Sequence, residues 1–295
     1  MSEKNRRDIL KAGLIAGGSL ALLNSCESFP DIEIAGISSR SVMRVGKAIV
    51  KASEQITPEQ EYYIGRSVAA NIYSRYRPYN DHSKTKYLNT LGLHLAQSSD
   101  LPETFGGYHF AILDSNEVNA FAAPGGFIFV TKGMLNCCQH EDALAAVLAH
   151  EIAHVQLQHG LNAIKNSRIT DAVLVTGTEA ASTLGGAELR KVATIFDDSV
   201  SDIMTNMIDN GFSRSDEYET DKLAVKIMGQ AGYQNRGMSD MLTTMDKKLK
   251  PGGLDFFKTH PSPQNRLSEL SASIDKSTIV PARRTQRFRV NIGQV

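Results

Sequence analysis

The sequence predicts an α+β domain that is mostly helical and contains a small sheet. Apolar residues recur at helical spacing in several segments between residues 57 and 275, whereas only the short runs 108–113 and 127–131 are typical of strands. With 295 residues, 41% of them hydrophobic, the chain can bury a sizeable core in one large domain or two small ones. Its 32 basic and 32 acidic residues balance, so the composition gives no indication of a nucleic-acid partner.

The first 25 residues have the pattern of an export signal. Basic residues, Arg6 and Arg7 among them, precede an apolar run over 12–23 that is short for a membrane span. The arginine pair resembles a twin-arginine signal, and Cys26 follows Leu23-Asn24-Ser25 as in a lipoprotein box. We therefore expect a bacterial envelope protein that faces the periplasm and is anchored to a membrane by lipid on Cys26. A plain signal peptide with an incidental cysteine and an uncleaved signal anchor are the alternatives.

Two helices are predicted after a linker over residues 26–56. Thr57 is a suitable cap, Pro58 suits the first helical position, and the helix should run towards Tyr76 and stop before Pro78. The segment 83–97 has apolar residues at core spacing and predicts the second helix.

The two predicted strands flank a segment that contains Pro124, Gly125 and Gly126. Proline and paired glycines do not fit a central strand, so this segment belongs at a sheet edge or in a simple hairpin turn. An exposed edge strand can bind an extended peptide through main-chain hydrogen bonds. Asn119, Gly125 and Gly126 are thus candidate binding residues.

An HExxH motif, His150 to His154, lies within a long apolar run. On a helix the two histidines share one face, so both imidazoles can reach a single metal ion, for which zinc is the natural candidate. Glu151 lies about 100° around the helix, where it can act as a general base beside that Lewis acid. A chance motif on a solvent-facing helix is the alternative, but apolar residues at spacings of four, four and three between Leu144 and Val155 favour a buried helix.

A catalytic zinc ion also needs a third protein ligand. His159 lies nine residues after His150, about 180° around a helix, and should point away. The third ligand should therefore come from a helix that Ser213 can cap, and spacing leaves its candidates open among three acidic residues: Asp216, Glu217 and Glu219. A solvated acidic first turn without a metal is the alternative.

Together these motifs resemble the HtpX- and BepA-like zinc metalloproteases, which are related to the CAAX prenyl endoproteases. The segment Asn119–Gly126, the HExxH motif, the segment Ser213–Asp221 and His260-Pro261 follow the order of that family over roughly 58–270. The resemblance implies a zincin-like metalloprotease domain over residues 57–275. It further implies one zinc ion per chain, protein or peptide substrates, and an edge strand that lines the active-site cleft.

The resemblance also implies roles for individual residues. The family pattern selects Glu217 as the third ligand, and Asp221 could hydrogen-bond a ligating histidine and fix its tautomer. His260 would face the zinc ion, where it could stabilise an oxyanion or occupy the open coordination position in a resting state. Arg266 is a second candidate for oxyanion support.

The predicted function is that of a zinc endopeptidase acting on misfolded or unassembled envelope proteins. A zinc-bound envelope chaperone or assembly factor with silenced or secondary protease activity is the first alternative. A lipoprotein interaction module with a relic motif is the second.

Two further segments carry weaker expectations. Residues 169–210 predict two amphipathic helices whose charges disfavour a membrane span. The tail over residues 276–295 carries four arginines and predicts a solvated edge strand or loose end, with attraction to anionic lipid headgroups as the alternative. Cys137 and Cys138 are adjacent in the sequence and are expected to be buried thiols.

Overall fold

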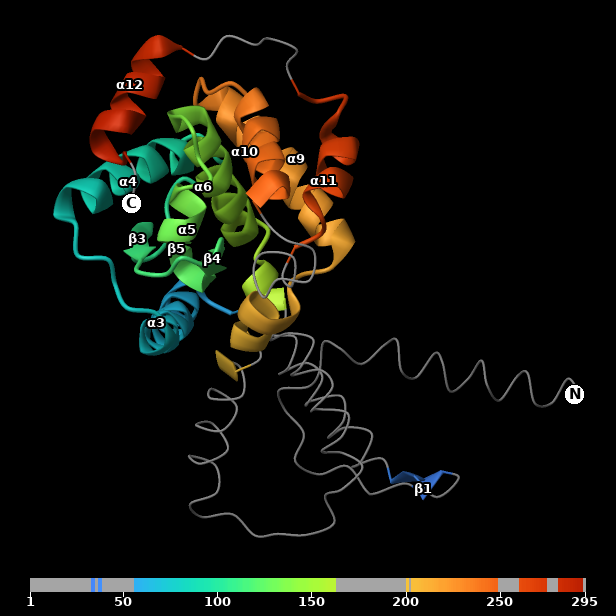
Figure 1. Ribbon diagram of the computed structural model, residues 1–295. Helices are drawn as coiled ribbons and strands as arrows, with labels where there is room; N and C mark the ends of the chain where they lie inside the picture. Colours follow the sequence, from blue (N-terminus) through green and yellow to red (C-terminus); the bar gives the residue numbers. More distant parts are fainter. Residues whose placement is uncertain are drawn as a thin grey trace, which may run out of the picture. The chain divides into compact units, whose positions relative to one another are not determined.

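The computed structural model in Figure 1 describes residues 33–34, 37–38, 56–162, 200–201, 203–248, 260–274 and 281–293. The predicted export signal, Cys26 and residues 163–199 lie outside this range. The chain divides into two units, Met1–Lys51 and Ala52–Val295. In the first unit, β1 (Glu33–Ile34) pairs antiparallel with β2 (Ile37–Ser38). The second unit holds every other element described below.

The second unit is mostly helical and contains one three-stranded sheet, as the sequence predicts. Its strands are β3 (His109–Leu113), β4 (Ala120–Ala123) and β5 (Phe127–Thr131), in the order β3-β5-β4. β5 pairs parallel with β3 and antiparallel with β4, and the short turn η1 (Pro124–Gly126) joins β4 to β5. Both alternatives for this segment are therefore realised, because β4 is an edge strand and η1 is a tight turn.

The first two helices follow their predicted bounds closely. α3 (Pro58–Arg75) begins with a capping box in which Thr57 and Gln60 satisfy each other's backbone N–H groups. α4 (His82–Ala96) begins after Asp81, whose carboxylate accepts a hydrogen bond from the N–H of Lys84. α4 packs on β3 and on the central helix α6.

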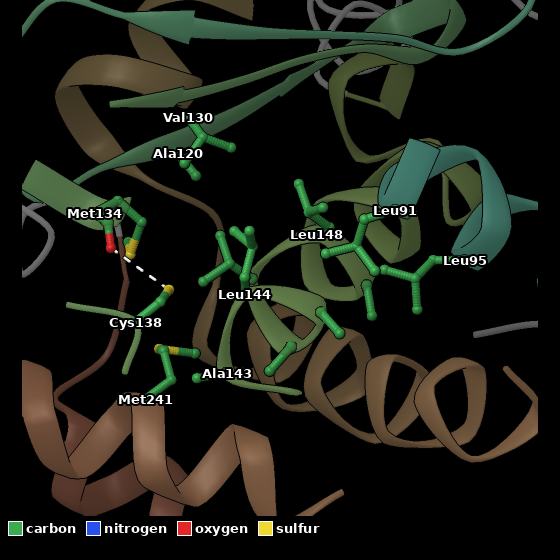
Figure 2. Packing of buried hydrophobic residues seen from close by; sticks show 14 of the residues in the cluster. Leu91, Leu95, Ala120, Val130, Met134, Cys138, Ala143, Leu144, Leu148 and Met241 are labelled. Atoms are coloured by element: carbon green, nitrogen blue, oxygen red, sulfur yellow. Dashed lines mark hydrogen bonds between the residues drawn. The ribbon is translucent and has the colours of Figure 1, made fainter. Parts of the chain in front are cut away.

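The central helix α6 (Glu141–Gln156) is buried on every side, and each of its residues up to Val155 is enclosed by protein. The sequence predicts one apolar stripe, but α4, α9, α10, α12 and β4 all pack against this helix. Figure 2 shows this core, in which Leu144 and Leu148 of α6 lie among residues of α4, the sheet and α10. Cys137 and Cys138 are free buried thiols, as expected, and the Cys138 thiol donates to the carbonyl of Met134.

Further helices of the described ranges are labelled in Figure 1. They are α5 (Lys132–Leu135), α9 (Arg214–Gln230), α10 (Arg236–Lys248) and α11 (Pro263–Leu270), and the π-helical turn η2 (Thr205–Asn210) precedes α9. α9 ends at Gln230, and Gly232, two residues later, has a positive φ of 77°, a conformation that commonly follows a helix end. None of the helices within the described ranges is long and apolar enough to cross a membrane.

The expectation of a solvated strand or loose end for the tail is wrong. Residues 282–291 form a helix, α12 (Ala282–Asn291), which packs on α4 and α6 and buries Phe288. Arg284 binds Asp142, and Arg287 binds Glu141 with its Nε 2.5 Å from Oε2. Two of the four tail arginines are thus neutralised inside the fold, which weakens the case for lipid headgroup attraction.

The docking of α12 gives a first prediction. Glu141 is 1% exposed, and among the described residues Arg287 is the cation that pairs with it, so Arg287→Met leaves a buried carboxylate without this ion pair. We expect a loss of about 2 kcal/mol in the free energy of unfolding, below the roughly 3–5 kcal/mol of a fully buried pair, because Arg287 is itself half exposed. Urea unfolding of the metal-free protein measures this loss.

The matched control is Arg283→Met, which changes an exposed arginine on the same helix. In a Glu141→Gln background the Arg287→Met loss should be smaller, because no buried charge is left behind. Equal losses for the two arginine variants would contradict the role of this ion pair.

Candidate metal centre

Four side chains converge in the core below β4. His150, His154, Glu217 and His260 each offer one ligand atom, and these atoms lie within 4.8 Å of one another. The Nε2 atoms of the two motif histidines are 3.1 Å apart, and each is 3.5 Å from an oxygen of Glu217. Ligand atoms of a tetrahedral zinc site with bonds of about 2.1 Å would be about 3.4 Å apart. The spacing of this triangle therefore fits a zinc-sized cation.

The structure distinguishes among the three acidic candidates on α9. Ser213 caps the helix, and Asp216 closes the capping box by accepting from the Ser213 N–H at 3.3 Å. Glu219 is exposed, whereas Glu217 is fully buried and faces the motif histidines. Of these three residues only Glu217 joins the cluster, in agreement with the family pattern.

The residues present fit a bound cation in charge as well as in spacing. Oε1 of Glu217 is buried without a hydrogen-bond partner, while Oε2 lies 2.6 Å from Nδ1 of His260. Burial alone would raise the pKa of Glu217, but the surrounding histidines hold it well below its ordinary value. A charged, partly unsatisfied carboxylate beside imidazoles is a donor set that suits zinc.

Asp221 and Arg266 support His150 from the side away from the cluster. Asp221 lies one turn after Glu217 on α9, and its Oδ1 is 3.0 Å from Nδ1 of His150. Arg266 of α11 donates from Nε to Oδ2 of Asp221 at 2.8 Å and from Nη2 to Oδ1 at 2.6 Å. Burial would raise the pKa of Asp221, but Arg266 and His150 lower it to about 2, so the group stays ionised.

This geometry corrects the role expected of Arg266. Its guanidinium is fully buried against Asp221 and the Nδ1 side of His150, and it does not line the cavity at the site. An oxyanion would form on the opposite, Nε2 side of that ring. From this position Arg266 can orient Asp221 and, through it, His150.

His159 lies beside His154, although helical spacing predicts that it points away. A continuing helix would direct it away, but α6 ends at Gln156 and Gln158 adopts a positive φ of 55°. The chain turns back, and Nδ1 of His159 lies 2.8 Å from Nδ1 of His154. A positive φ at a residue other than glycine has no reliable sequence signal, so only the nearby third histidine could have drawn attention to it.

A small cavity adjoins the ligand cluster. Residues of β4, residues of α6, the segment 207–212 and His260 line it. Its lining is Ala120, Phe121, Ala122, Glu151, His154, Met207, Gly211, Phe212 and His260. The prediction that an edge strand lines the cleft is therefore confirmed. The volume of this cavity is about 10 Å³, which is enough for about one water molecule.

The predicted peptide-binding residues lie at the two ends of β4, outside this lining. Oδ1 of Asn119 accepts from the N–H of Ala120 and so starts the strand. Gly125 and Gly126 form the turn with positive φ values of 73° and 89°, and the N–H of Gly125 donates to Glu61 of α3. These three residues hold the edge strand in place, while residues 120–122 face the site.

Burial and charge shift the titration of the central groups. Burial raises the pKa of Glu151 to about 7, with Glu217 adding to the shift and His150 opposing it. A group with that pKa suits general base chemistry near neutral pH. Burial and Arg266 act against a charge on His150, but hydrogen bonds to Asp221 and Glu217 outweigh them and raise its pKa to about 9.

A buried helix carrying HExxH, a carboxylate from a second helix and an edge strand beside them define the fold and site of an HExxH metallopeptidase. Comparison with protein families agrees, since residues 82–274 match the model for peptidase family M48. The chain belongs to peptidase family M48.

The individual relatives share less than a third of their aligned residues with this chain. The chain is 24% identical over 251 residues to the beta-barrel assembly-enhancing protease of Escherichia coli, an alignment that covers 84% of this chain and 47% of that protein. It is 29% identical over 164 residues to the mitochondrial metalloendopeptidase OMA1 of Schizosaccharomyces pombe, with 55% of this chain and 45% of the relative covered. The chain thus spans about half the length of the curated relatives it matches.

The ligand triangle predicts that Glu217→Ala lowers metal affinity severely. The loss should exceed the roughly 10–100-fold change that follows removal of an outer hydrogen-bond partner, because a ligand atom itself is lost. Competition with a zinc chelator measures it, and Glu219→Ala, on the exposed face of the same helix, is the control. A Glu217→Ala protein that keeps the parent affinity would overturn the assignment.

The raised pKa of His150 predicts a pH-dependent metal affinity. A folded-state pKa of about 9 means that the metal-free protein holds a proton on His150 below that pH, and a ligating histidine must lose it. Zinc binding at pH 7 should therefore release about one proton, and affinity should fall about tenfold per pH unit below pH 9. Calorimetry in two buffers of different ionisation enthalpy counts the proton. Binding without proton release would contradict the prediction.

Proposed function

We propose that this protein is a zinc-dependent endopeptidase of the bacterial cell envelope. The observation that carries the proposal is the buried triangle of His150, His154 and Glu217 with Glu151 in the adjoining cavity. This arrangement supplies three ligands, leaves one position for substrate or water, and places a base beside it. Membership of peptidase family M48 supports the same activity.

The roles of the side chains follow from their positions. Residues 120–122 of β4 would pair with the backbone of an extended substrate and place its scissile carbonyl over the site. Glu151 would take a proton from the attacking water and later deliver it to the leaving amine. His260 would donate a hydrogen bond to the carbonyl oxygen as negative charge develops there. A bound zinc ion supplies a Lewis acid that polarises the carbonyl and lowers the pKa of a water molecule.

The envelope location and the substrates rest on other support. The N-terminal sequence has the pattern of an export signal followed by a lipoprotein box at Cys26. The relative in Escherichia coli is named for enhancing assembly of β-barrels. We infer that the substrates are misfolded or unassembled envelope proteins, and that a lipid on Cys26 holds the enzyme at a membrane.

The test of the proposal is Glu151→Gln. This change keeps the ligands and the size of the side chain but removes the base, so zinc content should stay at one per chain. Cleavage of casein should fall at least about 100-fold, the lower range for loss of a general base. Glu219→Gln makes the same chemical change at an exposed site and should leave both unchanged. Parent-level cleavage by the E151Q protein would reject the assignment.

A second candidate function is a zinc-bound envelope chaperone or assembly factor whose protease activity is silenced. Two observations favour it: His260 offers a fourth ligand atom within the cluster, and the cavity has room for about one water. His260→Ala separates the two functions. Cleavage that appears only in this variant indicates a self-blocked enzyme, whereas zinc-loaded parent and variant that both fail to cleave casein favour the chaperone.

A further inference from the structure

The two motif histidines differ in what lies behind them. Nε2 of each ring faces the ligand cluster, so Nδ1 is the atom left to orient the ring. Nδ1 of His150 meets the carboxylate of Asp221, which Arg266 holds in turn. Within the described part of the chain, Nδ1 of His154 meets no carboxylate and instead lies 2.8 Å from Nδ1 of His159.

We propose that His159 is the positioning residue for His154, fixing its tautomer by accepting a hydrogen bond from Nδ1–H through its own Nδ1. The proposal rests on the proposed metal centre and extends it. A histidine that ligates through Nε2 carries its hydrogen on Nδ1, and this hydrogen needs an acceptor. His159 then carries its own hydrogen on Nε2, so the pair shares one proton between the facing nitrogens.

The fold holds His159 in this position from several sides. Gln158, with its positive φ, turns the chain at the end of α6, and a Cβ on Gly160 would lie 3.1 Å from the ring of Pro124. The ring of Phe212 packs against both imidazoles. Its centroid lies 4.8 Å from that of the His154 ring and 5.3 Å from that of the His159 ring.

A neighbouring hydroxyl does not compete for the lone pair on Nδ1 of His159, because it has no hydrogen left to donate to that atom. Oγ1 of Thr220 is 3.5 Å from Nδ1 of His159, at the limit of hydrogen bonding, and its hydrogen already goes to the carbonyl of Asp216 at 2.7 Å. Thr220 precedes Asp221 on α9, so one turn of that helix borders the partners of both motif histidines. The 2.8 Å contact between the two imidazoles is the shorter and stronger one.

The experiment compares His159→Asn with His159→Leu in the full-length protein. The two side chains have nearly the same shape, but Asn can place an acceptor oxygen where Nδ1 lies, and Leu places a methyl group there. We expect the leucine variant to bind zinc about 10–100-fold more weakly, as for loss of other outer partners of metal ligands. The asparagine variant should stay within about threefold of the parent. Competition with a fluorescent zinc chelator gives the affinities, and thermal melts of the metal-free forms check that each variant folds.

Two outcomes would overturn the proposal: a leucine variant that binds zinc as tightly as the parent, or an asparagine variant as weak as the leucine variant. The second would show that packing against Phe212, and not the hydrogen bond, is what matters. A parent that binds no zinc would instead reject the proposed function, so the two failures are distinct.

A measurement on the zinc-loaded parent does not depend on how the variants fold. Long-range ¹H–¹⁵N correlation spectra of the histidine rings should show Nδ1 protonated in His154 and unprotonated in His159. A hydrogen on Nδ1 of His159 would overturn the proposal.

Discussion

The packing of α6 against α9 inside the core is the constraint on which the site depends. Because α6 is buried on every side, its two motif histidines can find partners only among neighbouring protein groups and a bound cation. α9 supplies Glu217 and Asp221 from consecutive turns, and a buried carboxylate needs a cation or several donors beside it. Arg266 pairs with the carboxylate of Asp221. A cation held by the ligand cluster would pair with the carboxylate of Glu217.

Most of the fold around this pair could be predicted because its signals are local. Cap residues such as Thr57 and Ser213, a glycine after a helix, and the periods of apolar residues each act within a few residues. The same is true of the HExxH spacing. Glu217 is an intermediate case, since spacing left three acidic residues open and the family pattern selected one. The structure supplies the reason, because Asp216 is used in the helix cap and Glu219 faces solvent.

What could not be predicted depends on contacts between distant parts of the chain. Nothing near Arg287 in the sequence shows that Glu141 will be buried without a cation until α12 docks. Arg266 has the same character, since its role was misjudged until the position of Asp221 was known. The direction of His159 is mispredicted for a different reason. The prediction extends helical geometry past Gln156, where α6 ends. In each case the partner of a buried polar group comes from a contact that only the tertiary structure creates.

The edge strand shows how the rest of the domain supports the site. α3 holds one end of β4, where Glu61 accepts from the N–H of Gly125 and a Cβ on Gly65 would lie 1.9 Å from the carbonyl oxygen of Pro124. The other end is held by two hydrogen bonds of 3.1 Å between residues 119 and 131. Within the described residues β4 pairs only with β5, so its second edge has no strand partner. A short strand fixed at both ends can present that edge in one register, which a template for an extended peptide beside Glu151 requires.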